Sequence, residues 1–287
     1  MTYTIYQASS LRAMVKQLLP CAESKNISDS NYCSLGILSR KKENADEEAL
    51  FYAETHQPSF CMGLGMVLTT EDVKADNGHC VRVLTRDLDN ALASFGQRMV
   101  YMQLQDDGGI MLSTVESLSE GDETPVPSTR RMVFVQGEKV EPLTLPDNQK
   151  KEDSGCVCSG TVVERDTCIL ANKIELLDSL RFSVPLAATR GNGLRKQGVL
   201  LELTPEKMHV EGSNLSMYAM ANSRDPWLQA PRRQHQCMLA PDSVRHLLSA
   251  LSSYGEEQSL TLTVSTSEGN QSTLTVLCDT VMVIMDC

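Results

Sequence analysis

The sequence predicts an α+β protein of two similar domains, in which short helices lie on one face of antiparallel sheets. The main observation is a repeat. Four short amphipathic helix patterns occur along the chain, and each is followed by two or three strand-like runs. A segment rich in Ser, Pro, Gly, Asp and Glu separates the second repeat from the third. The 287 residues suffice for about two domains. Each domain should therefore contain a pair of strand–helix–strand–strand–strand repeats.

The helix patterns place their apolar residues on one face. In the first, apolar side chains recur at i, i+3, i+4 and i+7 from Leu11 to Leu18, and Ser9 is a candidate N-cap. The second and fourth patterns have the same spacing, whereas the third is spaced mostly by three. These three helices are expected at Arg86–Phe95, Asn172–Leu180 and Asp242–Leu251.

The strand candidates show period-two or continuous apolar runs, separated by turn residues. Three of them directly precede a helix: His79–Leu84, Thr161–Leu170 and Gln234–Ala240. The runs that follow the four helices are Ser34–Leu38 and Leu50–Ala53, Met99–Leu104 and Gly109–Val115, Gly198–Leu203 and Lys207–Val210, and Leu260–Val264, Ser272–Leu277 and Thr280–Met285.

These elements divide the chain into a first domain over residues 1–136, a linker over 137–160 and a second domain over 161–287. Arg131–Gln136 is a strand candidate that closes the first domain. Gly137–Gly160 is polar and rich in turn-forming residues, which is typical of a linker. Arg40–Glu48 is a second charged segment, expected to be a solvated hairpin tip.

The composition excludes several classes of protein. Hydrophobic residues make up 41% of the chain and are spread along it, which excludes collagen, coiled coil and wholesale disorder. No run approaches the roughly 18–20 apolar residues of a membrane span, and the N-terminus lacks the pattern of a signal peptide. A net charge of -11 argues against a protein that coats nucleic acid with its whole surface, although a local basic stripe is compatible with it.

The ten cysteines are dispersed, so we expect reduced thiols and a reducing compartment. Cys156, Cys158 and Cys168 lack the spacing or nearby histidine that would complete a tetrahedral site, and no metal or cofactor is expected. The five histidines share no metal-hydrolase spacing, and neither a phosphate-loop motif nor a nucleophile elbow is present. The sequence therefore gives no reason to assign catalysis.

The second half of the chain contains a strand pair with a recognisable pattern. Gly198–Leu203 reads Gly-Val-Leu-Leu-Glu-Leu, and Met208–Ala219 continues Met-His-Val-Glu-Gly-Ser-Asn-Leu-Ser-Met-Tyr-Ala. This pair resembles the one in DNA sliding clamps of the bacterial polymerase III β-subunit type. Cys168–Ser183 and Cys237–Leu251 are similar to the two strand–helix entries of such a domain, and the tail up to Met285 resembles its closing hairpin.

Two features depart from the bacterial pattern. The Thr-Asp-x-x-Arg-Leu core of that family is replaced by Ser213–Tyr218. The chain also has two clamp-like domains where the bacterial protein has three, which is the length of the trimeric clamps of the proliferating cell nuclear antigen type. A remote phage or plasmid clamp is compatible with both features.

The resemblance implies a processivity factor that encircles double-stranded DNA and tethers a DNA polymerase. The clamp loader and the polymerase would bind through short peptide motifs. Three chains would complete a ring of the family's size, joined head to tail because identical patches cannot close a three-fold ring. The implied location is the cytoplasm of a bacterial or phage-infected cell, with no membrane partner and no cofactor.

The resemblance also implies two groups of functional residues. Basic residues on or near the helices would face DNA phosphates: Arg12, Lys16, Lys173, Arg181, Arg190, Arg195, Lys196 and Arg245. A pocket for partner peptides would be formed by Leu194, Ser213, Leu215, Tyr218, Pro241, Leu247, Val283 and Met285. The methionines could add an adaptable groove, although core packing explains most of them.

Two alternatives to a ring-forming clamp remain open. The first is a clamp-like binding protein that has lost ring closure and regulates a replication factor. The second is a small-molecule enzyme on an unrecognised fold. The mass in solution distinguishes the clamp-like binding protein from the ring, because a ring predicts three times 31.6 kDa and the binding protein predicts one or two chains.

Overall fold

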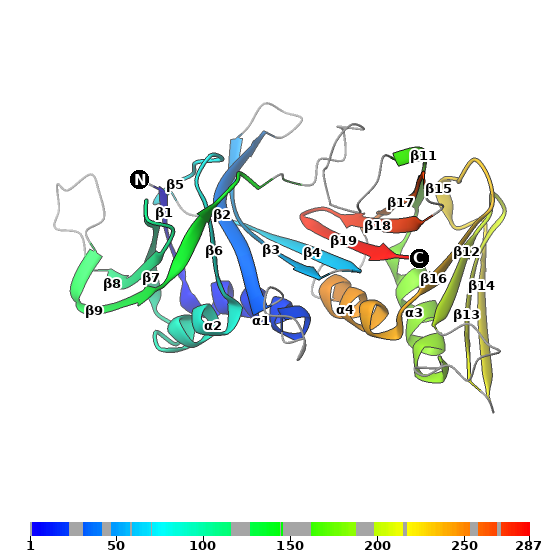
Figure 1. The fold of residues 1–287 in the computed structure, drawn as a ribbon, viewed down its shortest axis with the longest axis horizontal. Coiled ribbons are helices and arrows are strands. Elements are labelled where there is room, and N and C mark those ends of the chain that lie inside the picture. Colours follow the sequence, from blue (N-terminus) through cyan, green and yellow to red (C-terminus); the bar gives the residue numbers. More distant parts are fainter. Residues whose placement is uncertain are drawn as a thin grey trace. The chain divides into compact units, whose positions relative to one another are not determined.

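A computed structural model describes residues 2–22, 31–41, 47–57, 59–69, 71–115, 127–143, 145, 162–187, 198–214, 217–252, 258–268 and 271–287 (Figure 1). The chain forms two compact units. Unit 1 comprises Met1–Gln57 and Met62–Leu145, and unit 2 comprises Pro58–Cys61 and Pro146–Cys287.

Unit 1 is built mainly from two repeats of the predicted kind. The first contains β1 (Thr2–Gln7), α1 (Ala8–Ala22), β2 (Tyr32–Lys41), β3 (Glu47–Gln57) and β4 (Phe60–Val67). The second contains β6 (Cys80–Leu84), α2 (Thr85–Ala93), β7 (Met99–Leu104), β8 (Ile110–Val115) and β9 (Pro127–Val135). Two short strands supplement them, β5 (Val73–Lys74) and β10 (Gly137–Val140).

Unit 2 has the same order of elements. Its first repeat contains β11 (Val162–Leu170), α3 (Lys173–Ser183), the short 3-10 helix Val184–Leu186, β12 (Val199–Leu203), β13 (Lys207–Ser213) and β14 (Tyr218–Arg224). Its second contains β16 (His235–Leu239), α4 (Pro241–Ser252), β17 (Leu260–Ser267), β18 (Ser272–Cys278) and β19 (Val281–Asp286), preceded by β15 (Trp227–Gln229). The predicted fold class and fourfold repeat are therefore confirmed.

Within each unit, the two repeats exchange their first strands. In unit 1, β1 pairs with β7 of the second repeat, and β6 pairs with β2 of the first. In unit 2, β11 pairs with β17, and β16 pairs with β12. These pairs are all antiparallel. Because neither repeat completes its sheet alone, the pair of repeats is the folding unit.

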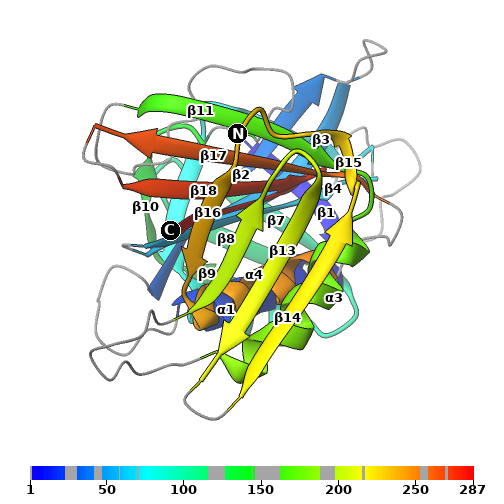
Figure 2. The same ribbon diagram turned by 90° about the vertical axis from the view of Figure 1, so that its right-hand side faces the viewer.

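The exchange gives each unit two sheets. Unit 1 has the orders β5-β1-β7-β8-β9 and β10-β6-β2-β3-β4, and unit 2 has β15-β11-β17-β18-β19 and β14-β13-β12-β16. In Figure 2, β13 and β14 run side by side, with α3 on one face of their sheet.

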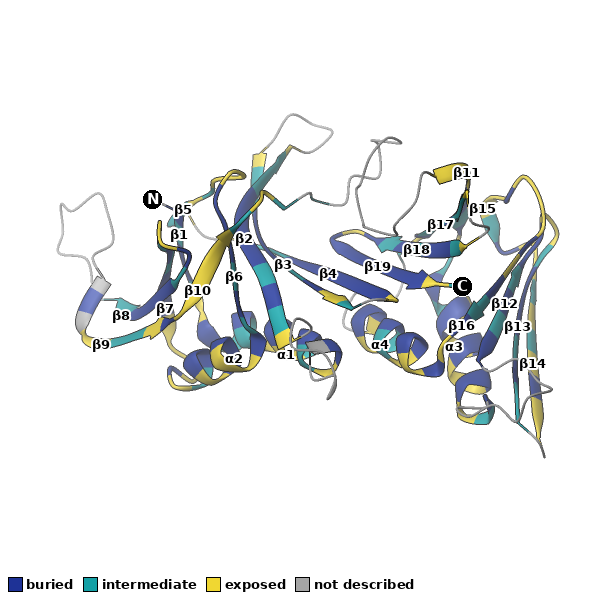
Figure 3. Ribbon diagram, in the orientation of Figure 1, coloured by how far each residue is buried: buried dark blue, intermediate teal, exposed yellow. Residues whose placement is uncertain are grey.

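The helices bury their predicted apolar faces. Leu11, Val15 and Leu18 of α1 are 0% exposed, and α1 packs against α2 (Figure 3). In unit 2, α3 packs against α4. Asn172 caps α3, because its side chain accepts a hydrogen bond of 2.9 Å from the backbone N–H of Ile174.

The structure corrects two local predictions. Helix α1 begins at Ala8, so Ser9 lies inside the helix and is not its N-cap. Gly137–Val140, placed in the linker, instead forms β10, which pairs with β6. Gly108 allows the backbone of β10 to lie very close to the turn before β8. It has a φ of +95°, and a Cβ there would lie 2.2 Å from the backbone nitrogen of Lys139.

Candidate nucleic-acid and peptide interfaces

The helices of unit 1 present two of the predicted DNA-facing residues. Lys16 is exposed on α1. Arg12, one turn earlier, is partly exposed and donates from Nε to Asp89 Oδ1 at 2.8 Å and from its second nitrogen to Oδ2 at 3.2 Å. This hydrogen bonding raises the pKa of Arg12, and the bidentate pair joins α1 to α2. Arg12 is therefore already neutralised by a carboxylate.

The two predicted DNA-facing arginines that are exposed in unit 2, Arg181 and Arg245, also have acidic neighbours. Arg181 lies 3.1 Å from Asp178 and donates to Ser252 Oγ at 2.9 Å. Arg245 forms an ion pair with Asp242 one turn earlier on α4. Exposed pairs of this kind contribute about 0.3–0.5 kcal/mol, so a phosphate can displace the carboxylate at little cost.

Lys173 does not belong to a solvent-facing basic surface. Its side chain is buried, with 1% exposed, and its Nζ donates to the backbone carbonyl of Leu251 at 3.0 Å. That carbonyl lies in the last turn of α4, where the helix dipole favours a cation. Lys173 therefore holds the end of α4 against α3, and the prediction that it faces DNA is corrected.

Five predicted site residues lie outside the described parts of the chain. They are Arg190, Leu194, Arg195, Lys196 and Leu215. Their assignment to the DNA-facing surface or the peptide pocket stays a prediction.

The remaining pocket candidates fall into two groups. Val283 and Met285 on β19 are 0% exposed, and Leu247 on α4 is 1% exposed. Pro241, at the start of α4, is also buried, and α4 contacts β19. These residues belong to the core of unit 2. A bound peptide would mainly contact the more exposed side chains around them, and these four buried residues would form the floor of its binding site.

The second group lies at the ends of β13 and β14, where Ser213 and Tyr218 form a cross-strand pair. Tyr218 is 57% exposed, and Met220 on the same strand is 50% exposed. Partial desolvation and the nearby Glu211 carboxylate raise the pKa of Tyr218. An apolar patch with an acidic neighbour therefore covers the end of β14.

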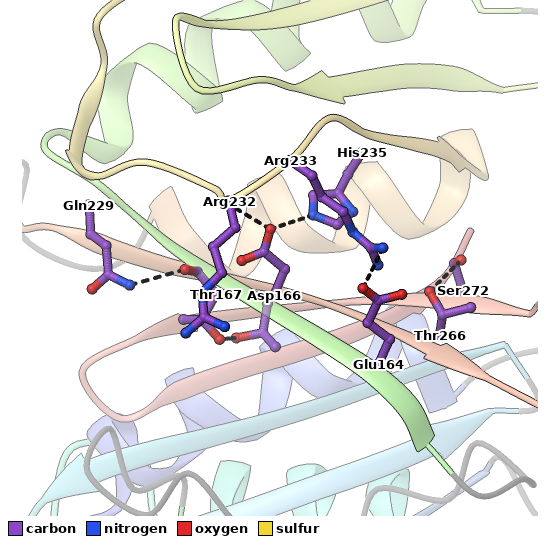
Figure 4. A network of polar contacts seen from close by, with 10 residues as sticks. Glu164, Asp166, Thr167, Gln229, Arg232, Arg233, His235, Thr266 and Ser272 are labelled. Atoms are coloured by element: carbon purple, nitrogen blue, oxygen red, sulfur yellow. Dashed lines mark hydrogen bonds and ion pairs between the residues drawn. The ribbon is translucent and has the colours of Figure 1, made fainter.

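Sequence reasoning missed a buried hydrogen-bonded pair in unit 2, Asp166 and His235, shown in Figure 4. Asp166 Oδ2 accepts hydrogen bonds from His235 Nε2 at 2.7 Å and from the backbone N–H of Arg232 at 2.9 Å. The two side chains are 4% and 7% exposed. Burial alone would raise the pKa of Asp166, but the His235 and Arg232 hydrogen bonds outweigh it and lower that pKa. The pair joins β11 to β16, 69 residues later.

A second network lies at the surface beside this pair. Glu164, two residues before Asp166 on β11, forms an ion pair with Arg233. Gln229 Nε2 donates to the Thr167 carbonyl at 3.2 Å. Together with Asp166 and His235, these contacts fasten the loop before β16 to β11.

The described residues contain no group of three His, Cys, Asp or Glu side chains that could hold a metal ion. His79 is held between Thr2 Oγ1 and the Gln105 carbonyl, each at 3.1 Å. His209 is hydrogen-bonded to Asn222 at 2.8 Å. Across those same parts of the chain, no helix has the length and apolarity needed to cross a membrane.

No protein-family model and no curated protein sequence matches the chain. Solved structures do match its fold. The DNA polymerase sliding clamp of Bacillus subtilis has a TM-score of 0.67 at 10% identity, with 99% of this chain and 64% of that chain covered. The β-subunit of DNA polymerase III from Pseudomonas aeruginosa has a TM-score of 0.65 at 11% identity, with 99% and 64% covered.

The β clamp of Helicobacter pylori, solved with a bound DNA ligase peptide, has a TM-score of 0.65 at 10% identity, with 99% and 66% covered. The chain thus spans about two thirds or slightly less of the length of these clamps. The chain therefore shares the fold of these clamps, including its fourfold repeat. The chain is a remote representative of that fold.

Proposed function

We propose that the chain is the subunit of a DNA sliding clamp, a non-catalytic processivity factor that encircles duplex DNA. The observation that carries the proposal is the match of 99% of the chain, with all four repeats, to the fold of bacterial β clamps. A tether of this kind raises the effective concentration of a polymerase at the template. Such a clamp retains the polymerase by encircling the DNA and by weak peptide contacts, so it needs no cofactor.

The DNA-facing surface is the exposed side of the helices. Lys16, Arg181 and Arg245 supply its cations, and the partners of both arginines are exposed carboxylates that phosphate can replace. Such exchangeable contacts bind backbone phosphate without reading sequence, which suits a sliding protein. Lys173 is excluded from this surface by its burial.

Charge reversal tests this surface. We expect the triple variant Lys16→Glu, Arg181→Glu and Arg245→Glu to be retained on nicked circular DNA at least tenfold less than the parent. Its retention should also depend less steeply on salt, because fewer counterions are released on binding. Retention is measured by gel filtration of the protein–DNA complex at several salt concentrations, with a clamp loader supplied.

The matched control reverses the same number of charges on exposed strand residues of unit 1, with Lys41→Glu, Lys74→Glu and Lys139→Glu. This variant changes the net charge equally but leaves the helices intact. If both triple variants lose the same amount of retention, the effect is one of net charge and the helices do not face DNA.

Ring closure requires two complementary edges on each chain. Strands β9 and β14 each lie at the end of a sheet. Phe134 on β9 is 65% exposed, and Tyr218 and Met220 on β14 are 57% and 50% exposed. An exposed apolar edge is an aggregation hazard unless another strand covers it. Pairing β9 of one chain with β14 of the next covers both edges and propagates head to tail, and three chains complete the ring.

Partner peptides are the second part of the proposal. The Helicobacter pylori clamp was solved with a DNA ligase peptide. We infer that a polymerase and a clamp loader bind this chain through comparable short peptides, above the floor that α4 and β19 provide. His246 on α4 is partly exposed and packs against Phe60, with 5.4 Å between the ring centroids, and burial lowers its pKa, which favours the uncharged imidazole.

One observation favours the alternative of a clamp-like protein that regulates a replication factor without forming a ring. Arg12, Arg181 and Arg245 are each paired with a carboxylate, and the chain carries a net charge of -11. A weakly basic helix surface limits DNA affinity. Both proposals place the protein in the cytoplasm, where reduced thiols persist.

A further inference from the structure

The sheet β5-β1-β7-β8-β9 of unit 1 carries an apolar cluster on one of its faces (Figure 1). Strand register places Ile5 of β1 opposite Tyr101 of β7, on the same face as Met111 of β8. These three side chains are 5%, 4% and 8% exposed. The rings of Tyr3 and Tyr101 stack on this face, with 5.3 Å between their centroids. Aromatic rings and methionines of this kind are enriched at protein interfaces.

The rim of this face is exposed. Alternation along β7 directs Met99 and Tyr101 to one side of the sheet and Val100 and Met102 to the other. Val100 and Met102 are 0% exposed, whereas Met99 is 48% exposed. Phe134 of β9, the cross-strand partner of Met111, is 65% exposed. A buried apolar centre with an exposed apolar rim is typical of an interaction surface.

We call this surface the apolar face of unit 1, and its main residues are Tyr3, Ile5, Met99, Tyr101, Met111 and Phe134. The five strands that form it contain no Asp or Glu. Their three charged residues are all cationic, namely Lys74, Arg130 and Arg131. The whole chain, by contrast, has 37 Asp and Glu against 26 Lys and Arg. The sheet is therefore a basic region of an acidic protein.

These three cations are exposed, and none forms an ion pair with a described residue. Arg12 and Arg245, by contrast, are each held by an aspartate. Lys74 lies on β5, opposite Tyr3, and β5 is one edge of the sheet. Arg130 and Arg131 lie on β9, which is the other edge. Unpaired cations therefore border the apolar face at both edges.

We propose that the apolar face of unit 1 is a docking site for a short acidic segment of a partner protein, in which Asp and Glu alternate with large apolar residues. The apolar side chains of that segment cover the Tyr3–Tyr101 stack and Met99. Its carboxylates pair with Lys74 at one edge and with Arg130 at the other. The site goes beyond the proposed function, whose peptide site is formed by α4 and β19 in unit 2.

The dimensions of the sheet suit a short segment. Five strands spaced by about 4.8 Å span about 19 Å, which about 6 extended residues cross. Charge also favours an acidic partner over a second copy of the chain. Two copies placed face to face would bring their cations together, and like charges at an interface are repulsive.

The test measures the binding of fluorescein-labelled peptides to the full chain by fluorescence anisotropy. The probe is a pool of peptides of about 12 residues, in which Asp or Glu alternates with Phe, Leu or Met. One control pool has Lys at the acidic positions, and the other has Ser at the apolar positions. We expect the full chain to bind the probe pool at least about tenfold more tightly than either control pool, and less tightly as salt is raised.

Charge reversal tests the edges of the site. Lys74→Glu combined with Arg130→Glu should weaken binding of the probe pool by about tenfold and make it less dependent on salt. The matched control is Lys207→Glu combined with Arg224→Glu, which reverses the same two residue types at a cross-strand pair of unit 2. The control variant should bind as the parent does.

A charge in the apolar rim tests the face itself. Met99→Asp should weaken binding of the probe pool by about tenfold, whereas Leu228→Asp, at a 69% exposed position of β15, should not. Both positions are at the surface, so the melting temperatures should stay close to that of the parent.

Equal binding of the three pools, no binding of the probe pool, or equal binding by the Met99→Asp and Leu228→Asp variants would overturn the proposal. A change in the mass in solution of the Met99→Asp variant, with its peptide binding unaltered, would also overturn it, because the face would then belong to contacts between copies of the chain.

Discussion

Replacing Met285 by alanine should lower the free energy of unfolding by about 2–5 kcal/mol, as for other buried large-to-small substitutions. The side chain is 0% exposed, and its neighbours on β19 are buried on both faces, with Val283 at 0% and Ile284 at 6%. Removing its atoms leaves a cavity in a packed core. Urea denaturation followed by far-UV circular dichroism measures the loss.

Met99→Ala is the matched control, because it makes the same chemical change at a side chain on β7 that is 48% exposed. Its effect on stability should stay within about 0.5 kcal/mol. Equal stability of the Met285→Ala variant and the parent would contradict the core assignment. It would instead support the expectation that Met285 acts as a peptide anchor beside Tyr218.

Replacing Asp166 by alanine should cost about 3 kcal/mol at pH 7, because it leaves the buried His235 ring and the Arg232 N–H without the carboxylate that accepts their hydrogen bonds. The cost should depend on pH. The pKa of Asp166 is lowered in the folded protein, so its contribution is fully present above the unfolded value of about 3.9 and is lost as the pH falls through the folded value. The difference in unfolding free energy between parent and variant should therefore stay constant down to about pH 4 and narrow below it.

Glu164→Ala is the control for this prediction, because Glu164 lies on the same strand and its ion pair with Arg233 is exposed. We expect it to change stability by less than about 1 kcal/mol. Unfolding free energies from urea titrations at each pH provide the comparison. A stability difference between the Asp166→Ala variant and the parent that stays constant from pH 7 to pH 3 would show that the ionised Asp166 carboxylate does not stabilise the fold.

The sequence predicts the repeat well because periodicity is a local signal. Each helix buries a face that four or five apolar residues specify, as Leu11, Val15 and Leu18 do in α1. Local signals could not reveal the exchange of strands, because β1 and β6 look like ordinary neighbours of their own helices. Strand β4 was also missed, since Gly63 and Gly65 break its apolar run.

The candidate site was less predictable, because burial depends on distant partners. Lys173 has the position of a solvated cation at a helix start, but its partner Leu251 lies 78 residues later. Asp166 and His235 belong to different repeats and share no spacing that indicates contact. The resemblance implied a peptide pocket at Val283 and Met285, but it could not show that both side chains are buried in the core of their own unit.

The mass of the protein in solution tests ring formation most directly. Light scattering coupled to size exclusion, repeated across dilution, should give three times 31.6 kDa for the parent. Phe134→Asp, which places a charge on the exposed apolar edge of β9, should reduce the mass to that of one chain, while Leu228→Asp on the exposed face of β15 should not. A mass of one or two chains for the parent at all concentrations would contradict the ring.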